Sequence, residues 1–109
     1  MASSAIDLVR DHFASLGTKR IEVPEWKLTV FSAPVTLSEK SRLYKKSQAS
    51  EMELLVDIII MKATDENGEK LFTIDNKITL LNKADSNVIG RLANAILSED
   101  APKVDELKN

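Results

Sequence analysis

Apolar residues are most densely grouped in the middle of the chain, over residues 51–63, where Asp57 is the only charge inside the apolar run. Ser50 precedes this segment and Glu53 lies three positions later, which is the spacing of a helix-capping box. Glu53 and Asp57 are four residues apart, so on a helix they would share one narrow, solvated polar stripe. The pattern therefore predicts a central helix over Glu51–Ala63, although a run rich in isoleucine and valine also suits a buried strand.

The N-terminal segment has apolar residues at helical spacing. Ser4 and Asp7 form a second capping-box pair, and Gly17 stands where a helix would stop. We therefore expect an amphipathic helix from Ala5 to Leu16. Its apolar stripe consists of Ile6, Val9, Phe13 and Leu16. His12 lies beside this stripe, and a single histidine without a second ligand predicts a surface residue rather than a metal site.

Residues 19–30 alternate between polar and apolar positions on both sides of Pro24-Glu25. Because proline presets the backbone of a turn, this pattern predicts a β-hairpin with strands 19–23 and 26–30. The primed turns that usually connect hairpins do not suit Pro-Glu, so we expect a longer or bulged loop. The expected buried face comprises Ile21, Val23, Trp26, Leu28 and Val30.

Three further helices are predicted, one before the central helix and two after it. Thr36 and Glu39 open a polar helix of about Leu37 to Ser47, with Leu37, Leu43 and Tyr44 as its apolar residues. Thr73 precedes a second helix, and Asp85 or Ser86 a third with Gly90 inside it. The second carries Ile74, Ile78 and Leu81, and the third carries Ile89, Leu92, Ala93 and Ile96.

A turn is predicted over Asp65-Glu66-Asn67-Gly68, because Asn-Gly tolerates a positive φ. We expect the positive φ at Gly68 and expect the carboxylate of Asp65 to cap nearby amides. Asp65, Asn67 and Glu69 alternate as in a calcium-binding loop, but the further ligands and the closing glutamate are missing. No metal site is therefore predicted.

Together these elements predict an α+β fold that is mainly α-helical, with four or five helices around a central apolar helix and one β-hairpin. Residues 1–97 are expected to form a single globular domain, and residues 98–109 a polar, disordered tail.

The composition narrows the possible functions. The chain has 109 residues, a net charge of −2 and no cysteine, so disulfide and thiolate chemistry are not expected. The charges are mixed, which gives no general attraction to nucleic acid or anionic lipid. The apolar run is too short for a membrane span, and the N-terminus lacks the features of a signal peptide, so a soluble cytoplasmic protein is expected. Neither a phosphate-binding glycine loop nor a catalytic constellation is present, so we expect no cofactor and no enzyme activity.

Two separated motifs carry a resemblance to a known family. The first is Val23-Pro24-Glu25-Trp26, which opens the hairpin, and the second is the turn Asp65-x-x-Gly68-x-x-Leu71-Phe72. Their order around an apolar helix resembles the tail assembly chaperones of long-tailed, lambda-like bacteriophages, over roughly Lys19 to Leu97. Lys27 stands where many such proteins would have a glycine.

The resemblance implies a non-enzymatic protein of the host cell cytoplasm that is absent from the mature virion. Such a chaperone coats the tape measure protein and helps to gather tail tube subunits around it, in many cases through a longer product of programmed frameshifting. The family also self-associates into open oligomers.

Two alternatives stay open from the sequence. Phe13, Leu92 and Ile96 are candidates for the surface that contacts the partner or further copies, but they also suit an ordinary core. The alternative function is a small helical adaptor or regulator that binds nucleic acid through the basic helix around Lys40–Lys46, a segment that also suits a plain solvated face. No aromatic residues are interleaved there for base stacking, which makes nucleic acid the less favoured partner.

Overall fold

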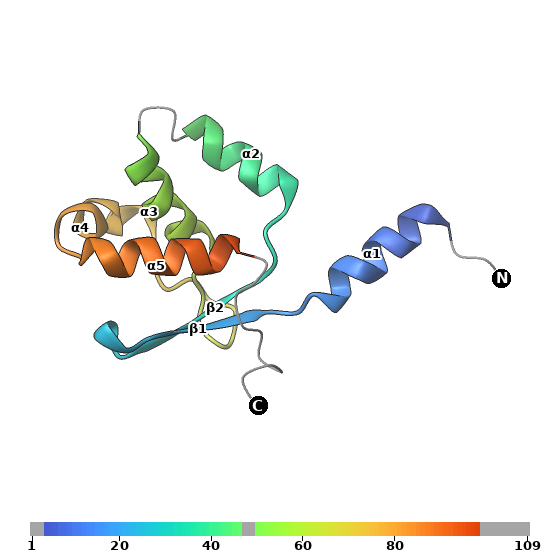
Figure 1. The fold of residues 1–109 in the computed structure, drawn as a ribbon, viewed down its shortest axis with the longest axis horizontal. Coiled ribbons are helices and arrows are strands. Elements are labelled where there is room, and N and C mark those ends of the chain that lie inside the picture. Colours follow the sequence, from blue (N-terminus) through green and yellow to red (C-terminus); the bar gives the residue numbers. More distant parts are fainter. Residues whose placement is uncertain (1–3, 47–49, 99–109) are drawn as a thin grey trace.

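A computed structural model describes residues 4–46 and 50–98 of the chain (Figure 1). The elements in order are α1 (Ala5–Ser15), β1 (Lys19–Val23), the 3₁₀ turn η1 (Pro24–Trp26), β2 (Leu28–Ser32), α2 (Leu37–Lys46), α3 (Glu51–Lys62), the 3₁₀ turn η2 (Ile74–Asn76), α4 (Lys77–Asn82) and α5 (Ser86–Leu97). The described residues thus form five α-helices and one antiparallel hairpin, which confirms the predicted fold class.

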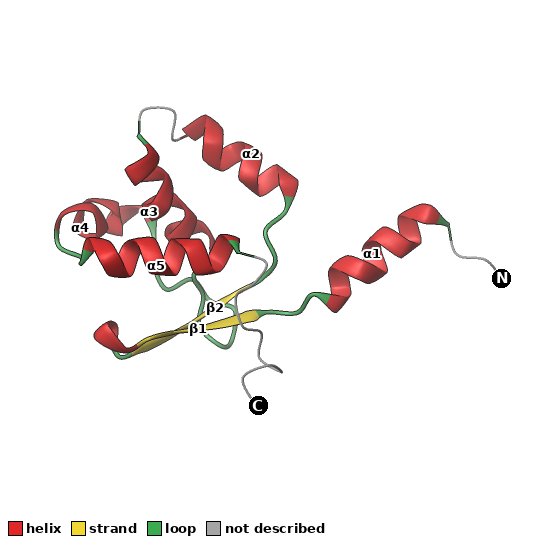
Figure 2. Cartoon of the chain, viewed as in Figure 1, coloured by secondary structure: helices red, strands yellow, loops and turns green. Residues whose placement is uncertain are grey.

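The apolar central segment is a helix, as predicted, and it lies in the middle of the helical layer. The hydroxyl of Ser50 accepts hydrogen bonds from the amides of Met52 and Glu53, at 3.1 and 3.4 Å, so the predicted N-cap is present. Helices α2, α4 and α5 pack against α3 (Figure 2). Ile58 and Ile59 are almost completely buried at this junction, which makes α3 the centre of the core.

The hairpin forms the second layer, under α5. Ile21 pairs with Val30 and Val23 pairs with Leu28, so apolar residues occupy the inner face on both strands. Ile21, Val23 and Val30 are buried, and Trp26 and Leu28 pack against the same core with partial exposure. The inner face thus consists of the residues that the alternation predicted.

The connection between the strands is longer than a two-residue turn, as expected from Pro-Glu. Pro24, Glu25 and Trp26 form η1, and the amide of Lys27 donates to the carbonyl of Pro24 at 3.0 Å. The second strand therefore spans Leu28–Ser32, and the predicted bounds of residues 26–30 were wrong by two residues. Lys27 then takes a left-handed conformation with φ 52° and ψ 46°. Among the described residues it is the one non-glycine with a positive φ, and it occupies the position where the family resemblance led us to expect glycine.

The predicted polar stripe on the central helix was wrong for Asp57. Its side chain is only 3% exposed, because α4 lies across it and the ammonium of Lys77 approaches its carboxylate to 3.1 Å. A charge on an otherwise apolar helix is therefore covered by an ion pair rather than by water.

The apolar stripe predicted after Thr73 was also wrong. The segment is divided into η2 and the short helix α4, so one helical period does not run through it. Leu80 is the buried residue, whereas Ile74 and Ile78 are 55% and 74% exposed. Two large aliphatic side chains are consequently left in solvent.

Helix α1 begins at the predicted N-cap, where the hydroxyl of Ser4 accepts from the amide of Asp7 at 3.3 Å. It ends at Ser15, and Gly17 follows with φ 70°, so the predicted stop is confirmed. The helix projects away from the rest of the protein (Figure 1), and none of its residues is buried.

The predicted tail falls outside the described residues except for Ser98, and Ser47, the expected end of the second helix, also falls outside them. Its disorder and the single-domain boundary stay predictions. No helix within residues 4–46 and 50–98 is both long enough and apolar enough to cross a membrane.

Candidate functional site

The two motifs that carry the family resemblance meet in the structure. Trp26 from the first motif and Phe72 from the second pack edge to face, with ring centroids 6.1 Å apart and an interplanar angle of 76°. Such an arrangement is favourable for aromatic pairs. Leu71 and Phe72 also pack against the buried core. These motif residues therefore hold the end of the hairpin against the chain that follows α3.

The acidic turn has the structure that the sequence predicted. One carboxylate oxygen of Asp65 accepts from the amides of Asn67 and Glu69, at 2.8 and 3.0 Å. The carbonyl of Asp65 accepts from the amide of Gly68 at 3.0 Å, and Gly68 has φ 85°. Asp65 is thus a capping residue of the turn. Within the described parts of the chain, no group of three histidine, cysteine, aspartate or glutamate residues is placed to hold a metal ion.

The turn is attached to the hairpin at its base. The amide and carbonyl of Thr64 exchange hydrogen bonds with the carbonyl and amide of Phe31, at 2.9 and 2.8 Å. The hydroxyl of Thr64 adds a third bond to the carbonyl of Phe31, at 2.6 Å. After the turn, the amide of Leu71 donates to the carbonyl of Ala63 at 3.1 Å. The turn is therefore fixed next to β2.

The first motif contributes an ion pair as well as a ring. Arg91 on α5 donates from both terminal guanidinium nitrogens to the carboxylate of Glu25, at 2.9 and 2.5 Å. The hydrogen bond from Arg91, supported by a backbone hydrogen bond at Glu25, lowers the pKa of Glu25 to about 2. This pair ties η1 to the last helix at the protein surface.

The sequence did not indicate the contact that holds α2. Lys62, at the end of α3, is buried, and its ammonium lies 3.1 Å from the carboxylate of Glu39 and 3.2 Å from the carbonyl of Pro34. Glu39 also completes the predicted capping box with Thr36. Burial raises the pKa of Glu39, but the hydrogen bonds from Thr36 and Lys62 outweigh it, so that pKa lies below its usual value.

The basic side chains that the structure describes on α2 do not form one continuous cationic face. Lys40, Arg42 and Lys45 are exposed. At 100° per residue, Arg42 and Lys45 lie 60° apart and share a face, whereas Lys40 lies 160° from Arg42 and 140° from Lys45. Only two of these three cations therefore lie together, which is less than the aligned row of positive charges that backbone phosphates would favour.

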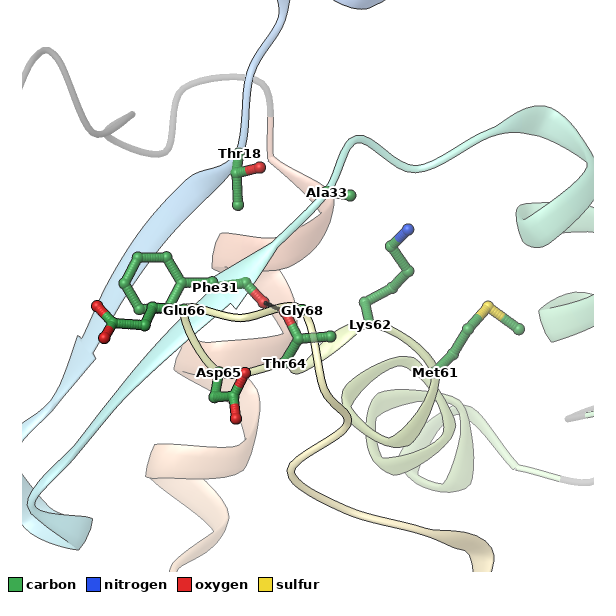
Figure 3. Close-up of a pocket in the computed structure, with 9 residues that line it drawn as sticks. All are labelled: Thr18, Phe31, Ala33, Met61, Lys62, Thr64, Asp65, Glu66 and Gly68. Atoms are coloured by element: carbon green, nitrogen blue, oxygen red, sulfur yellow. Dashed lines mark hydrogen bonds between the residues drawn. The ribbon is translucent and has the colours of Figure 1, made fainter.

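A groove of about 270 Å³ opens between β2, the end of α3 and the acidic turn (Figure 3). Phe31, Ala33 and Met61 supply its apolar surface, and Asp65 and Glu66 its acidic border. In Figure 3 the carboxylate of Glu66 lies beside the ring of Phe31, and Lys62 extends along the opposite side. The groove thus combines an apolar floor with a negative edge.

Of the three side chains predicted to contact partners, only Phe13 is accessible. It is 43% exposed on α1, where Ile6, Leu8 and Val9 are between 56% and 60% exposed. Leu92 and Ile96 are 1% and 0% exposed, so they are core residues, which is the alternative that the sequence left open for them; a partner contact of Phe13 stays a prediction. Their stripe on α5 is covered because the helix packs on both α3 and β1.

Comparison with solved structures shows which fold this is. The chain is similar to the bacteriophage HK97 tail assembly chaperone, with a TM-score of 0.50 and 16% sequence identity over 71% of this chain and 82% of the other. No protein-family model matches the sequence, and a search of curated proteins found no match. The likeness therefore lies in the fold, and it confirms at that level the family resemblance indicated by the two motifs.

Proposed function

We propose that this protein, which has the fold of a tail assembly chaperone, acts as one for a long-tailed bacteriophage. In this proposal it binds the tape measure protein, helps to gather tail tube subunits around it, and performs no catalysis. The observation that carries the proposal is the fold shared with the HK97 protein. The contact of Trp26 with Phe72 adds support, because both belong to the motifs that first suggested the family.

The exposed apolar side chains are consistent with a protein that covers another chain. Ile78 on α4 is 74% exposed and Leu37 on α2 is 84% exposed, in addition to the stripe on α1. Contiguous exposed apolar surface, such as the stripe on α1, often marks an interaction site. The client that suits them is a long, helical, aggregation-prone chain with repeated apolar stripes, and the resemblance implies such a client in the tape measure protein.

The test is co-expression with fragments of a tape measure protein. The expected result is that soluble fragment accumulates only in the presence of this protein. Ile78→Asp should reduce that yield at least several-fold while leaving helicity unchanged, because Ile78 is exposed. Thr79→Asp is the matched control, since it adds the same charge at the next, also exposed position. The proposal fails if no fragment is kept soluble by the wild-type protein.

Salt dependence distinguishes this function from nucleic-acid binding through α2. Apolar contact with a client should persist at high salt, whereas binding to phosphates weakens steeply as salt rises. Only two of the three exposed cations described on α2, Arg42 and Lys45, share a face, and this favours the first outcome.

The remaining parts of the proposal follow from the family. The protein would act in the host cell cytoplasm and be left out of the mature virion. Tail tube subunits would be recruited through a longer product made by frameshifting. Mass spectrometry of infected cells should find a minor, longer protein with the same N-terminal peptides, and purified particles should contain neither form.

A further inference from the structure

Helix α1 has an apolar face that no other element in the described part of the chain covers. It has 11 residues, none of them buried, and no other helix or strand in the described part of the chain packs against it substantially. An isolated helix of this length is only marginally stable in water, because nucleation is costly and few hydrogen bonds offset it. The apolar stripe would therefore be stabilised by a partner.

The charges around this stripe indicate what kind of partner fits. At 100° per residue, Ile6, Val9 and Phe13 share one face. Arg10 and His12 border that face on its two sides. Asp11 lies opposite the face, and Asp7 lies behind Arg10, with which it forms an exposed ion pair at 3.6 Å. A complementary surface should thus be apolar with an acidic border.

The groove beside the acidic turn has this character. Phe31, Ala33 and Met61 are apolar, and Asp65 and Glu66 lie at the edge. Two cations lie nearby, and each is bonded to another carboxylate. Lys62 is buried and bonded to Glu39, and Arg20, which lies by Phe31 and Glu66, is paired with Glu22 at 2.8 Å, so neither cancels the charge of that edge. Of the described residues, none forms a salt bridge with Glu66, whose carboxylate is exposed.

We propose that α1 of one copy docks in the acidic-edged groove of a second copy, with Phe13 against Phe31 and Met61 and with Arg10 near Glu66. The inference rests on the proposed function, because the family resemblance behind that proposal implies self-association into open oligomers, and it names the two surfaces that meet.

The helix is poorly placed to enter the groove of its own chain. Thr18, which lines the groove, follows the end of α1 by only three residues. Phe13 lies five residues before Thr18, and Gly17 directs the helix away from the body (Figure 1). A second copy is free of this constraint. Because the helix and the groove are different surfaces, each copy offers one of each, and the contact is head-to-tail rather than symmetric.

Two blocked variants test this arrangement by analytical ultracentrifugation. Phe13→Asp disrupts the apolar face of α1, which enters the groove in this arrangement. Ala33→Arg replaces an exposed residue of the groove with a long side chain that blocks it. The wild type should show a mass that rises with concentration, and each variant should stay monomeric. A 1:1 mixture of the two should give a heterodimer and nothing larger, because one intact helix and one intact groove remain.

Matched controls show that the effect is specific. Ala14→Asp places the same charge 100° away from Phe13, at an exposed position off the apolar face, and should associate like the wild type. Arg10→Glu should weaken association several-fold, and combining it with Glu66→Arg should restore it. Circular dichroism should show the helix content of every variant to be close to that of the wild type, apart from α1 itself.

The inference is overturned if Phe13→Asp or Ala33→Arg alone associates like the wild type or forms a homodimer. It is also overturned if the 1:1 mixture of the two variants stays monomeric. A third contrary result is an efficient disulfide within one monomer of the double variant Phe13→Cys, Ala33→Cys, because α1 would then reach the groove of its own chain. The rescue of tape measure fragments is scored separately. If rescue succeeds but the mixture stays monomeric, the function stands and this contact falls. If the heterodimer forms but rescue fails, the contact stands and the function falls.

Discussion

Replacing Lys27 by glycine should stabilise the protein. Lys27 has φ 52° and ψ 46°, a left-handed conformation that costs an L-residue roughly 1–2 kcal/mol. Glycine removes this strain but loses more freedom on folding, a cost of about 0.5–1 kcal/mol. The exposed side chain of Lys27 forms no salt bridge with any described residue, so little else is lost. The net gain should be about 0.5–1 kcal/mol, or a rise of about 2–8 °C in Tm for a domain of this size.

Two variants isolate the backbone as the cause. Lys27→Ala keeps the Cβ and removes the charge, so its free energy of unfolding should stay within about 0.5 kcal/mol of the wild type. Gly68→Ala makes the reverse change at φ 85°, where an added Cβ would meet no atom within 4 Å. It should destabilise by about 1 kcal/mol through strain alone. The reasoning is refuted if Lys27→Ala stabilises as much as Lys27→Gly in urea denaturation, because the charge would then be responsible.

Three other predictions follow from the ion pairs and the acidic turn. Arg91 holds the pKa of Glu25 at about 2, below its ordinary 4.5, so this pairing stabilises the fold above pH 4.5 and is lost as the pH falls toward 2. The difference in Tm between wild type and Glu25→Gln should therefore be constant above pH 4.5 and should shrink as the pH falls from 4.5 toward 2. A difference that grows toward low pH would contradict this. Lys77→Met removes the ammonium that pairs with the buried carboxylate of Asp57 and should cost about 3 kcal/mol, the low end for a buried pair because Lys77 is 21% exposed. In urea denaturation the double variant with Asp57→Leu should recover most of that loss, and a double variant no more stable than the single one would argue against the pair. Asp65→Ala removes two hydrogen bonds and should cost about 1 kcal/mol. A rise in Tm with calcium that this variant abolishes would instead show a metal site.

Features that depend on neighbours in the sequence were predictable. The N-caps at Ser4, Thr36 and Ser50, and the positive φ of Gly68, follow from side chains within three residues and from the conformational freedom of glycine. The alternation over residues 19–30 likewise gave the hairpin, its first strand and its inner face, although the second strand begins two residues later than predicted. Local hydrogen bonding and periodicity were therefore sufficient for most of the fold.

Features that depend on distant contacts were not predictable. Asp57 is buried because Lys77, twenty residues later, lies over it. Similarly, Leu92 and Phe13 both lie on amphipathic stripes, but only the stripe of Leu92 faces other elements. The packing of whole helices decides which apolar face becomes buried, and no one motif of a single sequence encodes that packing.

The packing of the hairpin under α5 also sets an order of events during synthesis. Lys19 donates to the carbonyls of Ala95 and Ile96, at 3.3 and 2.8 Å, and α5 packs on β1. Since Ile96 follows Val30 by 66 residues, a ribosome adding roughly 5–20 residues per second makes the cover about 3–13 s after the hairpin. Throughout that interval the inner face of the hairpin has no final partner. A chain released before α5 would keep that face open, whereas a change of reading frame after Ser98 would leave every described core contact in place.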